Sequence, residues 1–214
     1  NWLAKSHTFK DLKDSRSALL DLSFNVGGED LRTCLARVLE SDTQRELHSV
    51  CFDVIDGMKV LNYDSKDPLV GTFLSVLEYH QDESLRWRAA MKLSNVRDSV
   101  EVNRALLSSL KEDNSWRVRR ACIMGPKNNP VGDVLEEFID CVYHVIRNDD
   151  SPAVRASALG AISVLSDPMP VGFLIGVFKD DVSEEVRWRA LEILDGLRHM
   201  EDVRGALLLS LHSD

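Results

Sequence analysis

The sequence predicts an all-α fold in which antiparallel helix hairpins stack into an α-solenoid. The first observation behind this prediction is the composition: 44% of the 214 residues are hydrophobic, 29% are charged and only six are proline, which is an ordinary mix for a folded protein. The second is an internal repeat with a period near 34 residues, the sign of a repeat architecture. The third is the helical spacing of the apolar residues within each repeat.

The strongest repeat relates residues 83–113 to residues 184–214, which align without a gap. Fourteen of the 31 positions are identical, more than unrelated helices share by chance. Weaker copies lie between these two. In each copy an aspartate is followed six residues later by an arginine that a valine precedes. The aspartates are Asp113, Asp149 and Asp181, with Asp214 at the start of a further copy, and the arginines are Arg119, Arg155 and Arg187.

Two helices are expected in each repeat, and about six repeats fill the chain. Their approximate bounds are residues 8–40, 41–80, 81–112, 113–148, 149–180 and 181–214. The first two repeats fit the pattern less closely, and their expected helices cover residues 11–24, 29–40, 42–58 and 69–79. The repeat that contains Arg86 has His80 where the aspartate is expected. Because no low-complexity linker interrupts the pattern, we expect one domain over residues 1–214.

Local chemistry predicts where the helices of the later repeats begin and end. Ser151-Pro152 is an N-cap followed by proline at the first helical position. Gly125-Pro126 ends the first helix of its repeat, and residues 167–170, which contain two prolines, separate the helices of the next. In the last repeat, apolar spacing predicts a first helix over residues 186–197. Two acidic residues suit the N-terminus of its second helix, over residues 201–211.

The Asp, Val-Arg and Ala pattern resembles HEAT repeats over residues 81–214 and is most similar to the short-unit repeats of phycobilin-lyase-like proteins. The resemblance implies a right-handed superhelix with first helices on the convex side and second helices on the concave side. It also implies a ladder, in which each arginine bonds turn carbonyls and the carboxylate of the next repeat. The ladder residues are then Asp113, Arg119, Asp149, Arg155, Asp181 and Arg187.

The end of the chain carries a further expectation. Asp214 stands where another repeat would begin, and the chain does not start with methionine. We therefore expect a fragment of a longer array, or an array that lacks its capping repeat, because a bare terminal repeat would leave an apolar face in water.

Two Trp-Arg pairs, Trp87-Arg88 and Trp188-Arg189, are candidates for contact with a partner. Their place beside the buried stripe of the first helix directs the tryptophans away from the core or to its margin. Two interpretations stay open: each tryptophan contacts a partner, as binding hot spots do, or it lies flat on the neighbouring helix and completes the packing. The second helices offer further candidates on the concave face, which are Arg104, Glu136, Asp140, His144 and Arg204.

These observations favour a non-catalytic scaffold that binds a partner protein or peptide. One alternative is an enzyme subunit like the bilin lyases that the resemblance implies. Another is nucleic-acid binding through an arginine patch beside Trp116, although a net charge of −9 disfavours that partner. The patch consists of Arg86, Arg88, Arg117, Arg119 and Arg120.

Neither an enzyme nor a cofactor is expected. The sequence contains no HExxH, GxSxG, P-loop or GxGxxG motif, and its six histidines are scattered. We therefore expect no catalytic residues, metal or cofactor. No apolar run is long enough to span a membrane. The cysteines Cys34, Cys51, Cys122 and Cys141 form no disulfide-like framework, which favours a reducing, cytoplasmic location.

Overall fold

A computed structural model describes Ser17 and residues 28–41, 45–58, 63–125, 132–165, 171–197 and 203–205. The helix expected over residues 11–24 lies outside the described residues apart from Ser17. The helix expected over residues 201–211 lies outside them apart from residues 203–205, which are helical, and so does Asp214.

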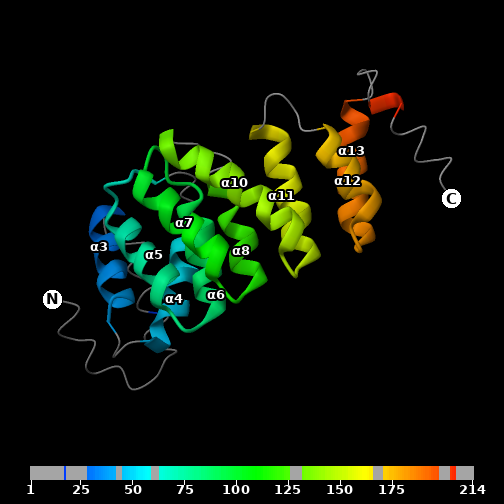
Figure 1. The fold of residues 1–214 in the computed structure, drawn as a ribbon. Coiled ribbons are helices and arrows are strands. Elements are labelled where there is room, and N and C mark those ends of the chain that lie inside the picture. Colours follow the sequence, from blue (N-terminus) through cyan, green and yellow to red (C-terminus); the bar gives the residue numbers. More distant parts are fainter. Residues whose placement is uncertain are drawn as a thin grey trace.

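The described residues are helical over most of their length (Figure 1). In chain order the helices are α3 (Gly28–Leu39), α4 (Arg45–Gly57), α5 (Pro68–Tyr79), α6 (Glu83–Leu93), α7 (Val100–Glu112), α8 (Trp116–Cys122), α10 (Gly132–Asn148), α11 (Pro152–Leu165), α12 (Val171–Asp180) and α13 (Glu184–Gly196). No strand occurs among these residues, where one isolated bridge joins Tyr63 to Val96. The all-α prediction is confirmed.

Neighbouring helices pack against one another in a regular order. The first helices of successive repeats contact each other in the series α4, α6, α8, α11 and α13, and the second helices do so in the series α3, α5, α7 and α10. Each second helix also packs on the first helix of the next repeat, as α5 does on α6 and α12 on α13. Figure 1 shows this progression from the blue α3 to the orange α13.

The bounds of α5 and α13 differ from the predicted ones by one or two residues, because each helix begins before the first apolar residue of its stripe. Helix α5 begins at Pro68 because the carboxylate of Asp67 accepts the N–H of Leu69 at 3.0 Å, and proline suits the first helical position. Helix α13 begins at Glu184, directly after Ser183 and before the first buried residue of its stripe, Val186.

One continuous cluster of buried apolar side chains runs from Leu31 in α3 to Val203. Its largest members are aromatic, and the rings of Phe52 and Phe73 stack with their centroids 5.7 Å apart. The cluster also encloses thiols: burial raises the pKa of Cys51 to about 12, so this cysteine stays protonated near neutral pH. None of the described helices has the length and hydropathy that crossing a bilayer requires.

Candidate functional site

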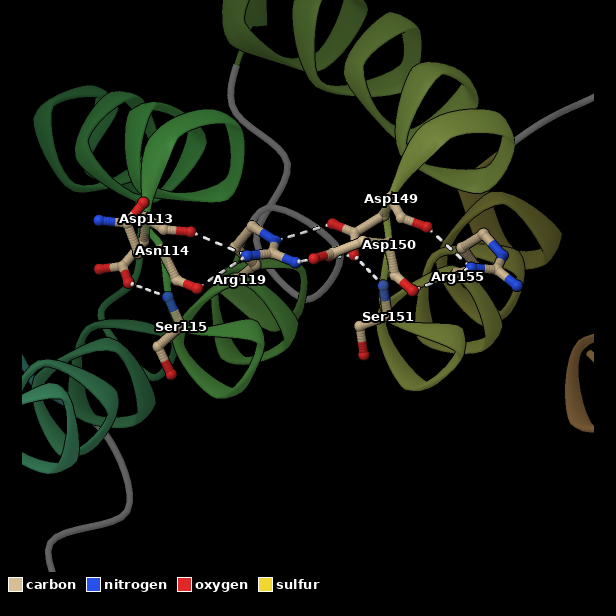
Figure 2. Close-up of polar contacts among 8 residues, drawn as sticks. All are labelled: Asp113, Asn114, Ser115, Arg119, Asp149, Asp150, Ser151 and Arg155. Atoms are coloured by element: carbon tan, nitrogen blue, oxygen red, sulfur yellow. Dashed lines mark hydrogen bonds and ion pairs between the residues drawn. The ribbon is translucent and has the colours of Figure 1, made fainter.

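Arg119, on α8, links the turn that follows α7 to the turn that follows α10 (Figure 2). Its Nε and Nη2 donate to the two carboxylate oxygens of Asp149 at 2.8 and 2.9 Å. Its Nη1 donates to the main-chain carbonyl of Asp113 at 2.9 Å. One guanidinium therefore binds the turn of its own repeat and the acid of the next, a geometry that the planar fork of arginine allows.

The same contacts recur on both sides of this rung. Arg86 donates to Asp113 at 2.7 and 3.0 Å and to the carbonyl of His80 at 2.8 Å. Arg155 donates to Asp181 at 3.0 and 2.8 Å and to the carbonyl of Asp149 at 2.8 Å.

Arg187 begins the last rung in the same way, donating to the carbonyl of Asp181 at 2.8 Å. The aspartate expected to complete this rung, Asp214, lies outside the described residues.

Each ladder aspartate also shapes its own turn. One carboxylate oxygen of Asp149 accepts the N–H of Ser151 at 2.9 Å, and Asp181 accepts that of Ser183 at 2.8 Å (the first of these is visible in Figure 2). Burial alone would raise the pKa of these carboxyls. The hydrogen bonds from the arginine and the serine N–H outweigh it, so the pKa of Asp149 and of Asp181 lies below the usual value. Both aspartates are therefore ionised near neutral pH.

Two histidines form the equivalent rung between α4 and α6. His48 Nδ1 lies 3.2 Å from His80 Nε2, His48 Nε2 lies 3.2 Å from the carbonyl of Ser41, and His80 Nδ1 accepts the N–H of Asp82 at 3.0 Å. The carbonyl of Ser41 can only accept, so the Nε2 of His48 carries a proton. The Nδ1 of His80 accepts a hydrogen bond, so the proton of this ring is on its Nε2, which donates to His48.

This pair reproduces the ladder contacts without charge. His48 takes the place of the arginine beside a turn carbonyl, and His80 takes the place of the aspartate that accepts an N–H two residues on. The sequence showed His80 as a departure from the pattern, but the match of His48 to the arginine position was missed.

Arg88, expected to contact a partner, is bound within the chain. Its Nη2 donates to Asp53 at 2.9 Å and to Asp56 at 2.5 Å, and its guanidinium carbon lies 5.2 Å from the centroid of the Phe52 ring. Only 16% of its side chain is exposed. Arg88 therefore acts as a strut that joins α6 to α4.

Arg189 occupies the corresponding place on α13. Its guanidinium crosses to α11 beside Gly160, where a Cβ would lie 2.9 Å from Arg189 Nη2. It also pairs with Glu192 on its own helix at 2.9 Å. The absence of a side chain at Gly160 leaves the space that this strut fills.

The strut position, defined as the second residue after the ladder arginine, is small in the two middle repeats. It is Ala121 on α8 and Ser157 on α11, where α6 and α13 have arginine. The residues that face the strut position also change. Asp53 and Gly160 face Arg88 and Arg189, whereas the equivalent residues on α6 and just beyond α8 are Met91 and Met124.

An apolar groove opens where the strut is missing. It encloses about 480 Å³ between α6 and α8 and extends to α11. Four large apolar side chains in its wall are partly exposed: Trp87 at 40%, Met91 at 40%, Trp116 at 42% and Met124 at 37%. The remaining wall is formed by Arg117, Arg120, Ala121 and Ser157.

The two arginines of the groove differ from the others on these helices. Arg117 lies over the ring of Trp116, 5.6 Å from its centroid, and Arg120 Nε donates to Ser157 Oγ at 3.1 Å. Neither has a carboxylate within ion-pair distance in the described part of the chain, and both are exposed. The other three arginines of the predicted patch, Arg86, Arg88 and Arg119, are all neutralised by aspartates.

The structure separates the remaining candidates. Trp188 is 59% exposed, but it does not line the groove that contains Trp87. The five candidates on the second helices are all exposed and have mixed charge; they are Arg104, Glu136, Asp140, His144 and Arg204. Among them, His144 lies near the ladder, because it lines the same pocket of about 590 Å³ as Arg119 and Asp149.

The methionines and the small strut residues were missed by sequence reasoning, although the repeat contained the signal for them. Aligning the repeats on the ladder arginines places Ala121 and Ser157 at the same position in the repeat as Arg88 and Arg189.

Among the described residues, no group of three or more His, Cys, Asp or Glu side chains could hold a metal ion. No protein-family model matches the chain, and a search of curated proteins finds no significant match.

Proposed function

We propose that this chain is a HEAT-type α-solenoid and a non-catalytic scaffold that binds a partner protein or peptide in the groove between α6 and α8. One observation carries the proposal: two tryptophans and two methionines, each more than a third exposed, line a single groove of about 480 Å³. Apolar surface gathered in this way on a folded chain is typical of an interaction site.

The solenoid part of the proposal is supported by the repetition of contacts. The rungs at Arg86, Arg119 and Arg155 share the same pair of carboxylate bonds and the same turn carbonyl. Identical connections between successive repeats produce a constant rotation from one to the next, which generates a superhelix.

The groove has the chemistry of a binding hot spot. Tryptophan and arginine are enriched among residues that dominate binding energy, and methionine adapts its shape to varied apolar partners. Among the described residues of the second helices, the exposed large apolar side chains are Tyr79 on α5 and Val100 on α7, and Tyr79 lines a pocket that does not include Val100. We therefore assign the partner to the first-helix side rather than to the concave side that the resemblance implied.

A matched pair of substitutions tests this assignment. Trp116→Ala removes a groove residue that is 42% exposed, and Trp188→Ala removes a residue that is 59% exposed outside the groove. Both proteins and the wild type are used as bait in extracts of cells that make the chain, and retained proteins are identified by mass spectrometry.

A partner that is lost with Trp116→Ala and kept with Trp188→Ala supports the proposal, provided that circular dichroism shows unchanged helicity. Equal retention by all three baits would refute the groove as the binding site. If Trp116→Ala unfolds the chain, Trp87→Ala provides a second test on the opposite wall.

A further inference from the structure

We infer that the groove binds an acidic amphipathic helix of a partner protein, an inference that rests on the proposed function. The charge around the groove gives the first reason. Arg117 and Arg120 are exposed at its wall without a carboxylate partner among the described residues, whereas Arg86, Arg88 and Arg119 on the same two helices are paired. A partner that supplies carboxylates would complete the pattern, because charge-assisted bonds to arginine are strong and directional.

The shape of the groove gives the second reason. Trp87 and Met91 lie one turn apart on α6, and Trp116 and Arg120 lie one turn apart on α8, so the groove follows the helices that form it. A helix that lies in such a groove presents apolar residues at positions i, i+3 or i+4, and i+7. The contact would cover about two turns of the partner.

Strand addition is a poorer fit to this surface. It requires the free edge of a sheet, and the described residues contain no strand. The occupant therefore offers side chains rather than main-chain hydrogen bonds, with leucine or phenylalanine between the tryptophans and methionines and glutamate or aspartate over the two arginines.

Within the described residues, the repeat explains why exposed apolar side chains and two arginines without carboxylate partners meet in this gap. Between α4 and α6 the strut Arg88 carries its charge to Asp53 and Asp56 and covers Phe52. Between α6 and α8 the strut is Ala121, and the side chain that faces it is Met91 rather than an acid. The gap thus lacks both the cation that would fill it and the carboxylates that would neutralise its arginines.

A peptide-display selection tests the inference. A library of random peptides long enough for three helical turns is selected on the immobilised chain and then counter-selected on Ala121→Arg, which restores the strut and fills the groove. Because Ala121 is buried, this variant is first checked for native helicity, and Trp87→Ala replaces it if it fails to fold.

The inference predicts that the surviving peptides carry net negative charge and apolar residues at helical spacing. Their affinity should fall about tenfold for Arg117→Ala with Arg120→Ala, because two exposed ion pairs each contribute modestly to the binding energy. It should stay unchanged for Arg37→Ala with Arg97→Ala, two exposed arginines outside the groove. Binding should also weaken moderately with added salt.

Other outcomes separate the two proposals. Peptides that depend on Ala121 but are basic or uncharged would overturn the acidic partner and leave the scaffold function standing. Peptides that bind Ala121→Arg as tightly as the wild type would overturn the groove itself. Labelled oligothymidine that displaces the peptides and loses affinity with Trp116→Ala would overturn the inference in favour of single-stranded nucleic acid.

Discussion

Replacing Arg119 by alanine measures how much one rung of the ladder stabilises the fold. The side chains of Arg119 and Asp149 are only 11% and 6% exposed, so the pair is largely removed from water. The substitution removes two bonds to Asp149, the ion pair with Asp150, and the bonds to the carbonyls of Asp113 and Asn114. Removing one partner of a buried pair costs about 3–5 kcal/mol. We expect the lower end, about 3 kcal/mol, because Ser151 still donates to the carboxylate.

Urea unfolding followed by far-UV circular dichroism provides the measurement. A cycle of Arg119→Ala, Asp149→Ala and the double variant should give a coupling energy above about 1.5 kcal/mol. Lys111→Ala is the control, because its pair with Glu137 is 2.8 Å long but has exposed side chains, and such pairs contribute at most about 1 kcal/mol. The reasoning fails if Arg119→Ala costs no more than Lys111→Ala, or if the coupling is close to zero.

Three further predictions concern acid, the uncharged rung and the thiols. The pKa of Asp149 and of Asp181 is lowered in the folded chain. The stabilisation by these carboxylates is therefore complete above the usual aspartate pKa of about 3.9 and is lost as the pH falls through the lowered pKa. The urea midpoint of the wild type should drop over this acid range, and that of Asp149→Asn should drop less. His48→Arg combined with His80→Asp should rebuild a charged rung, so thermal unfolding should show the double variant losing at least about 1 kcal/mol less than the sum of the single variants. Because burial raises the pKa of Cys51 to about 12, iodoacetamide near neutral pH should leave it unmodified until urea unfolds the chain, and modification of the native chain at this residue would contradict its burial.

The bounds of several helices could be predicted because caps, prolines and apolar stripes determine helix ends through neighbouring residues. Ser151-Pro152 predicts the start of α11, which begins at Pro152, and apolar spacing predicts α5 and α13 to within one or two residues. The rung from Arg119 to Asp149 also lies in the geometry that the resemblance implied. Spacing sufficed there because the aspartate and the arginine recur six residues apart in the copies that begin at Asp113, Asp149 and Asp181.

The groove could not be predicted in the same way because it depends on what is missing. Arg88 beside Trp87 suggested a binding pair, but its charge is used by Asp53 and Asp56, which lie 35 and 32 residues earlier in the sequence. Conversely Ala121 carries no chemical signal of its own. Its importance appears only when the neighbouring helix places Met91 opposite it, which is a property of packing between repeats.

The separation of the ladder from the struts has an evolutionary consequence. The ladder arginine fixes how successive repeats join, while a different side chain, two residues later, decides whether the space between neighbouring first helices is filled, as by Arg88, or open, as at Ala121. Changes at the strut position and at the residue that faces it can therefore open or close a cleft while the residues of the ladder stay the same. A lineage built on this plan can move its binding surface along the molecule one repeat at a time while the backbone stays constant.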